Sequence, residues 1–167
     1  AIGAHPGLPD RESQGRREHA LPPTFVEELI VSQVGTLMAI SQEEGVSLTH
    51  VKPHGALYNM AARDRVVADA IASALIRINR RLILVGLAGS ELIAAGSAHG
   101  LRVAAEGFAD RGYQANGRLV PRGQPGAIIH DEALVIERAR SLAMDDRLTA
   151  IDGSRLHTHI HTLCLHG

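Results

Sequence analysis

Five short runs of aliphatic and β-branched residues recur along the chain and predict β-strands. They cover residues 1–4, 46–51, 82–85, 101–105 and 162–165. Longer amphipathic stretches separate most of these runs and predict helices. Because strands that alternate with helices form parallel sheets, the pattern predicts an α/β fold whose strands are buried on both faces.

The predicted helices are recognised by their apolar spacing and by their first residues. Thr24 and Glu27 form a capping-box pattern after two prolines and predict the start of the first helix. Its apolar face is expected to contain Phe25, Leu29, Ile30, Val34, Leu37 and Met38. The second helix has a stripe of Val66, Val67, Ala70, Ile71, Ala74, Leu75 and Ile78. Residues 91–98 predict a short third helix, and Asp131 predicts the cap of a fourth. The inner positions of the fourth helix are Leu134, Val135, Arg138, Ala139 and Leu142.

The number of strands limits the architecture. The 167 residues are long enough for one domain with one core. Five strands are too few to close a barrel, which needs about eight, and the chain starts in one predicted strand and stops just after another. We therefore expect residues 1–167 to form a single, incomplete (β/α) barrel domain. Its open sheet edge makes a homo-oligomer one possible arrangement.

Polar, turn-forming residues follow four of the predicted strands. They form the segments "AHPG" at 4–7, "VKPHG" at 51–55, "EGFADRGY" at 106–113 and "CLHG" at 164–167. Because the carboxyl ends of parallel strands lie on one side of a sheet, these segments are expected to meet at one opening. The predicted opening is lined by His5, Lys52, His54, Glu106, Asp110, Arg111 and His166.

Charge and composition exclude several classes of partner. The formal net charge of −1 provides no basic stripe for nucleic acid and no polybasic patch for anionic lipid. We see no apolar run that approaches the roughly 20 residues of a membrane span, and no signal peptide. Cys164 is the only cysteine, which excludes an internal disulfide and suits a reducing compartment. These features predict a cytoplasmic protein with a small-molecule partner.

Lys52 is the only lysine, because every other cation of the 17 is an arginine. A lysine ammonium is compact and its pKa changes readily on burial, so it fits a tight site that an arginine does not. The alternative is a solvated surface lysine in an arginine-rich chain. Residue type alone leaves both readings open.

Three alternating histidines precede the last predicted strand. His157, His159 and His161 would project from one face of a strand. Neighbours at this spacing on a flat strand lie too far apart to close on one metal ion. We therefore expect at most a weak, adventitious metal site here.

Six segments carry a resemblance to a known family. They are "IGAHPGLPD" at 2–10, "GRR" at 15–17, "VKPHGALYN" at 51–59, "EGFADRGY" at 106–113, "GRLVPRGQPGAII" at 117–129 and "TLCLHG" at 162–167. In type and order they resemble the motifs of the 5-oxoprolinase A-subunit family, also called the LamB/YcsF family. The resemblance implies an incomplete barrel of the glycoside hydrolase/deacetylase type. It also implies ATP-dependent hydrolysis of 5-oxo-L-proline to L-glutamate, giving ADP and phosphate, together with two partner subunits.

The chain departs from the family pattern in three places. The family's opening segment, with an Asp-Leu-Asn-Cys-Asp strand and a Gly-Phe-His-Ala-Gly loop, is not found in residues 1–167. Nor are the Asp after the final His-Gly and the closing helix, so this chain alone is expected to be inactive if those segments supply site groups. The segment "RESQGRRE" replaces a Gly-Phe-Gly pattern and predicts a reshaped loop around Ser13 and Gln14.

The implied chemistry suggests catalytic roles. Opening a lactam needs an activated carbonyl, a nucleophilic water and stabilisation of the oxyanion, and ATP can activate the amide oxygen by phosphorylating it. Lys52 would offset the charge on a phosphate or oxyanion. Glu106 or His54 would act as the base for water. The alternative for Glu106 is a structural salt bridge with Arg111.

Other residues are expected to bind substrate. Arg122 in "LVPRG" can hold the substrate carboxylate through a two-pronged contact, or can instead cover a loop carbonyl. The remaining residues of the predicted substrate site are His5, Asp110, Arg111 and His166. A divalent metal is an open question, and the histidines that could bind it are His5, His54 and His166.

Two other function classes remain, and so does the place of ATP. A metal-dependent amide or sugar deacetylase uses a similar barrel, and a noncatalytic subunit could present a lactam or small sugar to its partners. The glycine-containing segment at 86–96 lacks the Gly-Lys-Ser/Thr ending of a phosphate-binding loop. ATP, the expected co-substrate, therefore binds either at the barrel opening or on the partner subunits.

Overall fold

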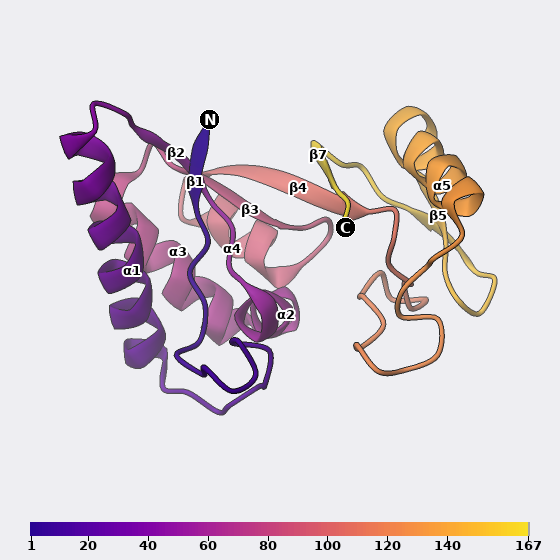
Figure 1. The fold of residues 1–167 in the computed structure, drawn as a ribbon, viewed down its shortest axis with the longest axis horizontal. Coiled ribbons are helices and arrows are strands. Elements are labelled where there is room, and N and C mark those ends of the chain that lie inside the picture. The colour runs from indigo at the N-terminus through magenta and orange to yellow at the C-terminus, as the bar shows by residue number, and fades with distance from the viewer. Residues whose placement is uncertain (167) are drawn as a thin grey trace. The chain divides into compact units, whose positions relative to one another are not determined.

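The computed structural model describes residues 1–166 and divides the chain into two compact units (Figure 1). The first unit comprises residues 1–86 and 90–103, and the second comprises 87–89 and the described residues from 104 onward. The single-domain expectation stays a prediction. Gly167, the last residue of the predicted "CLHG" segment, lies outside the described residues.

Five parallel strands confirm the predicted alternation with helices. They are β1 (Ile2–Ala4), β2 (Leu48–Val51), β3 (Ile83–Leu87), β4 (Arg102–Phe108) and β7 (Thr162–Cys164). Their hydrogen-bonded order is β1-β2-β3-β4-β7, and the β1–β2, β2–β3 and β4–β7 pairs are parallel. Each strand lies within a few residues of its predicted position, although β4 continues to Phe108.

Four helices form the core of the first unit with its strands. They are α1 (Pro23–Glu43), α2 (Gly55–Arg63), α3 (Arg65–Asn79) and α4 (Glu91–Ala98). Helix α3 contacts both α1 and α4, and these helices bury aliphatic side chains against the strands. The residues with no exposed surface include Val26, Ile30, Val34, Val51, Ile71, Leu75 and Leu84. The second and third predicted helices are confirmed as α3 and α4, whereas α2 was not predicted because its first residues were interpreted as a turn.

The predicted start of α1 is wrong. The helix begins at Pro23, and its cap residue Pro22 makes no side-chain hydrogen bond. Proline suits the first helical position because it lacks an amide hydrogen that would need a partner there. Glu27 forms an ion pair with Arg77 at 3.4 Å instead of a capping-box contact. The buried face also contains Val26 rather than Phe25, which is 38% exposed.

Helix α1 bears on the expectation about long apolar runs. Its length of 21 residues and its composition would by themselves allow it to cross a membrane, but apolar helices in protein cores share both features. Val26, Ile30 and Val34 on α1 are fully buried, and the helix contacts α3.

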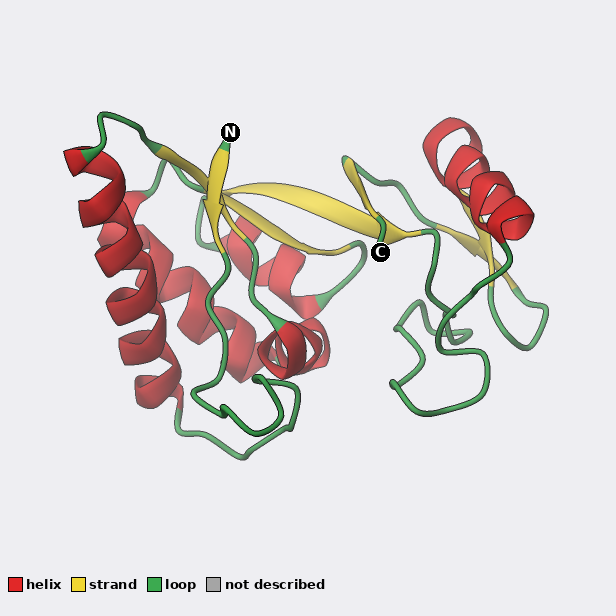
Figure 2. Cartoon of the chain, in the orientation of Figure 1, coloured by secondary structure: helices red, strands yellow, loops and turns green. Residues whose placement is uncertain are grey.

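The second unit contains long loops around one helix and one hairpin (Figure 2). Asp131 caps α5 (Glu132–Asp145) by accepting a hydrogen bond from the Leu134 amide at 3.2 Å, as predicted. Only Leu142 of the predicted inner positions is fully buried, and Leu134 is 41% exposed. The antiparallel hairpin of β5 (Arg147–Thr149) and β6 (Arg155–His157) was not predicted.

The three alternating histidines do not lie on one strand, contrary to the expectation from the sequence. Strand β6 ends at His157. His159 contacts the Asp146 carboxylate at 3.1 Å, and Nδ1 of His161 accepts a hydrogen bond from the Ala105 amide at 3.1 Å. The rings of His159 and His161 lie edge to face with their centroids 5.2 Å apart, and each also contacts a different residue.

Candidate functional site

A pair of histidines lies at the carboxyl ends of β1 and β2 in the first unit. The two strands are in register at Ala4 and Val51, so the residues that follow them emerge side by side. The Lys52 amide donates to the Ala4 carbonyl at 3.0 Å, which continues the strand pairing. His5 and His54 then approach each other with ring centroids 4.8 Å apart. We call His5, Lys52 and His54 the histidine-pair cluster.

The hydrogen bonds of the histidine pair determine where its protons lie. Nδ1 of His5 is 2.7 Å from the Lys52 carbonyl, and Nε2 of His54 is 2.9 Å from the Gln14 carbonyl. Because a carbonyl oxygen only accepts, both of these nitrogens must donate. The remaining nitrogens, Nε2 of His5 and Nδ1 of His54, are 2.9 Å apart. Two neutral rings would place two lone pairs against each other, so a hydrogen bond between these two nitrogens requires one extra proton on the pair.

The loop at 7–17 packs closely around His54. The Ala56 amide donates to the Gly15 carbonyl at 2.9 Å. Gly55 has a φ of +52°, and a Cβ atom there would lie 2.6 Å from the Gly15 carbonyl oxygen. Only glycine meets both conditions. The segments "AHPG", "GRR" and "VKPHG" therefore pack together, and the Gln14 backbone contacts the histidine-pair cluster through its carbonyl.

Lys52 is half-buried, with its Nζ 5.8 Å from the centre of the Tyr58 ring. A cation over an aromatic ring is stabilised by about 0.5–1 kcal/mol at an accessible position. This contact holds the ammonium group close to the first turn of α2, which begins directly after His54. The catalytic role of Lys52 stays a prediction.

A second cluster lies in the second unit and contains Phe108, Asp110 and His166. We call it the Asp110–His166 cluster. Asp110 is 7% exposed, and its Oδ2 atom accepts hydrogen bonds from the His166 amide at 3.0 Å and from Nδ1 of His166 at 2.8 Å. The Phe108 and His166 rings are stacked with centroids 5.7 Å apart. Glu106, another predicted site residue, is buried within β4.

Arg111 holds the long loop of the second unit together. Its Nε donates to the Ala127 carbonyl and its Nη2 to the Val120 carbonyl, both at 2.8 Å. Burial lowers the pKa of Arg111, and the positive charge of Arg122 lowers it further. Arg122 itself is exposed on the loop that Arg111 holds. Arg111 thus has a structural role, while its contact with substrate stays a prediction.

Arg138 and Tyr113 support the same region, and their roles were not predicted. Arg138 of α5 donates to the carbonyls of Ala109 at 2.9 Å and Arg111 at 2.8 Å. The buried Tyr113 hydroxyl accepts a hydrogen bond from the Phe108 amide at 2.9 Å, and burial raises the pKa of Tyr113. An arginine on the inner side of a predicted helix was the available signal for Arg138.

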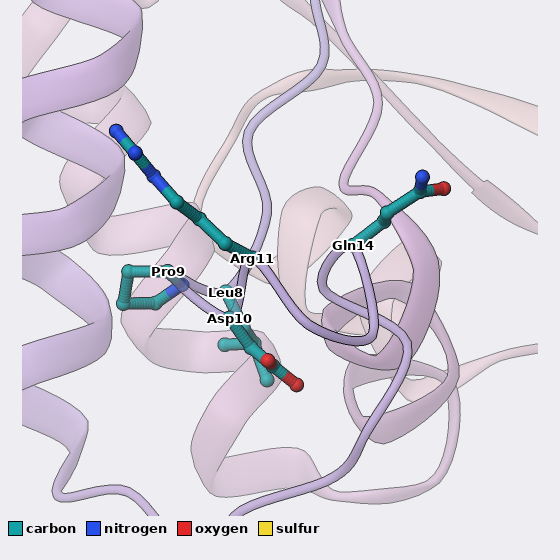
Figure 3. A pocket seen from close by; sticks show the side chains of 5 residues that line it. All are labelled: Leu8, Pro9, Asp10, Arg11 and Gln14. Carbon is teal, nitrogen blue, oxygen red and sulfur yellow. The ribbon is translucent and has the colours of Figure 1, made fainter.

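A shallow hollow of about 420 Å³ in the first unit is lined by the loop at 8–14 (Figure 3). In Figure 3 the side chains of Arg11 and Gln14 diverge to the upper left and upper right, and the Asp10 carboxylate points downward, away from both. Asp10 accepts hydrogen bonds from the Ser13 hydroxyl and amide, which lower the pKa of Asp10. These groups do not converge, so the hollow is a poor candidate site.

The described residues form no cluster of side chains that could bind a metal ion. Within residues 1–166, no three His, Cys, Asp or Glu side chains gather closely enough to hold a metal ion. We identify neither His5, His54 nor His166 as a metal ligand, and a divalent metal stays a prediction. The predicted meeting of both clusters at one opening also stays a prediction, because they belong to different units.

Comparisons with known proteins place the chain among related sequences. The model of the LamB/YcsF family matches residues 1–167. A protein from Geobacillus thermodenitrificans, named as the A subunit of 5-oxoprolinase, is 50% identical over 100% of this chain and 65% of its own length. A protein of the same name from Methylococcus capsulatus is 48% identical, with 64% of its length covered. The chain thus spans just under two thirds of the length of these relatives.

One solved structure confirms the expected fold class. The crystal structure of a lactam utilization protein from Thermus thermophilus matches 99% of this chain and 67% of that chain. The sequence identity is 43% and the TM-score is 0.92. Parallel strands alternating with helices, as expected for an incomplete (β/α) barrel, are therefore shared with that protein.

Proposed function

Because this chain belongs to the LamB/YcsF family, we propose that it forms part of the A subunit of an ATP-dependent 5-oxoprolinase. The enzyme would hydrolyse 5-oxo-L-proline to L-glutamate with conversion of ATP to ADP and phosphate, in the cytoplasm and together with two partner subunits. The observation that carries the proposal is identity of 48–50% over the whole chain with proteins that bear this subunit's name.

The histidine-pair cluster suits the charges of this reaction. Ring opening of an activated lactam builds negative charge on oxygen, and a fixed positive group near that oxygen lowers the barrier. A proton shared between His5 and His54 would give the pair one positive charge, and Lys52 adds another in the same unit. Both nitrogens of His54 are engaged, so His54 would have to release one bond before it acted as a base. We therefore assign His54 and Lys52 to charge stabilisation.

ATP enters the proposal as a co-substrate. Helix α4 begins after a glycine-containing loop, but the Ser90 hydroxyl already accepts a hydrogen bond from the Ile93 amide at 3.3 Å. That amide is not free to bind a phosphate. Binding of ATP at the strand ends or on a partner subunit therefore fits better than binding at the start of α4.

The test is an assay of the full-length protein with its two partner subunits, 5-oxoproline and ATP. We expect glutamate and ADP to appear together, and only when all three subunits are present. Lys52→Ala should lower kcat by about 100- to 1,000-fold, the usual effect of losing one stabilising group. Arg11→Ala, in the hollow, is the matched control and should keep full activity.

Three outcomes would contradict the proposal. Absence of glutamate from the complete wild-type assembly would reject 5-oxoprolinase activity. Binding of 5-oxoproline without turnover would favour a noncatalytic binding subunit, and metal-dependent release of acetate from an acetylated amide or sugar would favour a deacetylase. If Lys52→Ala retained full activity, the role assigned to Lys52 would be wrong.

A further inference from the structure

Asp110 and His166 meet because of the register between β4 and β7. Glu106 pairs with Thr162 and Phe108 pairs with Cys164 in this parallel arrangement. Continuing the same register by two residues brings Asp110 opposite His166, just beyond the carboxyl ends of both strands. Strand pairing therefore brings the two residues together, although 56 positions separate them in the sequence.

The Asp110 carboxylate holds the His166 ring in one orientation and one tautomer. Oδ2 of Asp110 accepts from both the amide and Nδ1 of His166, and a carboxylate oxygen can only accept. Nδ1 therefore carries a hydrogen, and the lone pair of the neutral ring lies on Nε2. The Asp110 side chain is 10% exposed and that of His166 is 40% exposed. The carboxylate is thus shielded while the imidazole is accessible to solvent.

Two further groups restrict this arrangement. The Phe108 ring lies nearly parallel to the His166 ring, at an interplanar angle of 8°. The Tyr113 hydroxyl accepts a hydrogen bond from the Phe108 amide, which fixes the end of β4. Oδ1 of Asp110 is buried and has no hydrogen-bond partner among residues 1–166. A buried carboxylate with an unpaired oxygen is costly in a purely structural role, so it is informative where it occurs.

We propose that His166 is the general base of the lactam-opening reaction and that Asp110 is its positioning residue. This inference rests on the proposed function. It replaces the sequence-based choice between Glu106 and His54 as the base, because Glu106 is buried within β4 and both nitrogens of His54 are engaged. In contrast, Nε2 of His166 takes no part in the contact with Asp110, and the His166 side chain is 40% exposed.

The proton transfers balance without any group beyond ATP and water. ATP first phosphorylates the amide oxygen of the lactam, which releases ADP. Nε2 of His166 then takes a proton from water as the water oxygen bonds to the ring carbonyl carbon. When the bond between this carbon and the ring nitrogen breaks, Nε2 returns the proton to the nitrogen, and the new hydroxyl group on the carbon releases its own proton to solvent as the carbonyl of the acyl phosphate forms. A second water molecule hydrolyses the resulting acyl phosphate to glutamate and phosphate.

Kinetics of variants in the full three-subunit assembly test this role. Asp110→Asn and His166→Gln should each lower kcat by about 100- to 10,000-fold and change KM little, as for loss of a general base. The matched controls are Asp146→Asn and His159→Gln, which alter an exposed Asp–His pair of the same unit. Both controls should keep wild-type kcat and KM. If kcat were unchanged and only KM rose, Asp110 and His166 would be substrate-binding residues and the base assignment would be overturned.

A spectroscopic measurement separates this inference from the proposed function. In ¹⁵N NMR spectra of the full-length protein, we expect His166 to be protonated at Nδ1 in the wild type. In Asp110→Asn the two neutral tautomers should mix. Detection of the Nε2-protonated tautomer in the wild type would overturn the roles proposed for Asp110 and His166 even if the enzyme were active. If the wild-type assembly made no glutamate, the proposed function would fail while the tautomer measurement still tested the Asp110–His166 geometry. His166→Gln carries the kinetic test if Asp110→Asn fails to fold, because His166 is accessible to solvent.

Discussion

Nε2 of His5 lies 2.9 Å from Nδ1 of His54, and the outer nitrogen of each ring donates to a backbone carbonyl. The carbonyls belong to Lys52 and Gln14. Both rings are thereby held in orientations in which a proton between them is required. The hydrogen bonds of this pair thus depend on three separate segments of the chain.

The proton positions of this pair can be measured directly. We expect ¹⁵N NMR of the full-length protein to show His5 protonated at Nδ1, His54 protonated at Nε2, and one shared proton coupled to both inner nitrogens. His5→Gln should remove the shared proton, so that the His54 ring is neutral and its Nδ1 carries no hydrogen. His19→Gln, which changes an exposed histidine of the same unit, should leave the His54 signals unchanged. Finding either ring in the opposite tautomer would contradict the assignment.

Gly55 should be intolerant of a side chain. Gly55→Ala must place a Cβ atom 2.6 Å from the Gly15 carbonyl oxygen at a φ of +52°. Gly45→Ala is a matched control, since Gly45 has a φ of +69° but open space around it. The control should lose about 1–2 kcal/mol for the left-handed backbone. Gly55→Ala should lose about 1–3 kcal/mol more from overpacking. Urea unfolding measures both, and equal losses would show that the packing around Gly15 is loose.

Arg138 should matter more for stability than its position on a mostly exposed helix suggests. Its guanidinium donates to the carbonyls of Ala109, Arg111 and Thr149, and burial lowers the pKa of Arg138. Arg138→Met leaves these carbonyls without that donor and should lower the free energy of unfolding by about 2–3 kcal/mol. Arg140→Met, on an exposed position of the same helix, should change it by less than about 0.5 kcal/mol. Similar effects of the two substitutions would argue against a stabilising role of the Arg138 hydrogen bonds to these carbonyls.

The ion pair between Glu18 and Arg63 should make stability depend on pH in acid. The Arg63 hydrogen bond holds the pKa of Glu18 below its ordinary value of 4.5. The pair therefore stabilises the folded state fully above the unfolded-state pKa, and the effect is lost as the pH falls through the folded-state pKa. Both side chains are more than one-third exposed, so Glu18→Gln should cost less than about 1 kcal/mol at neutral pH.

This prediction is checked by denaturant unfolding as a function of pH. The difference between wild type and Glu18→Gln should shrink to zero in strong acid. Glu12→Gln serves as the control because Glu12 is 86% exposed and lies 4.0 Å from Arg17. A difference for Glu18→Gln that stayed constant from neutral pH to strong acid would mean that the substitution acts through packing rather than charge.

Local patterns were sufficient for much of the fold. The α4 helix at Glu91–Ala98 and the cap at Asp131 lie where the sequence predicted them, and the five parallel strands lie within a few residues of prediction. In each case the signal comes from residues a few positions apart, such as a capping side chain and the amide it accepts from. Interactions of this range survive in many tertiary contexts.

The errors have a common physical origin in distant partners. Glu27 was expected to cap its own helix, but it pairs with Arg77, 50 residues away. Phe25 was expected inside, yet Val26 is buried because the packing of α1 on α3 selects that face. The first residues of helix α2 were interpreted as a turn. The helix that follows is stabilised by its packing against α3 and α4, which is a distant contact that the local sequence does not show.

The sequence by itself determined which polar residues follow the strands and are candidates for the site, because these segments can be recognised from residue types along the chain. Only the tertiary structure decided what these residues do to one another. The lone pair left on His166, the proton held between His5 and His54, and the loop carbonyls bound by Arg111 all depend on contacts between distant segments. A side chain's protonation and orientation follow from the atoms within hydrogen-bond distance, and strand register and loop packing determine which atoms those are.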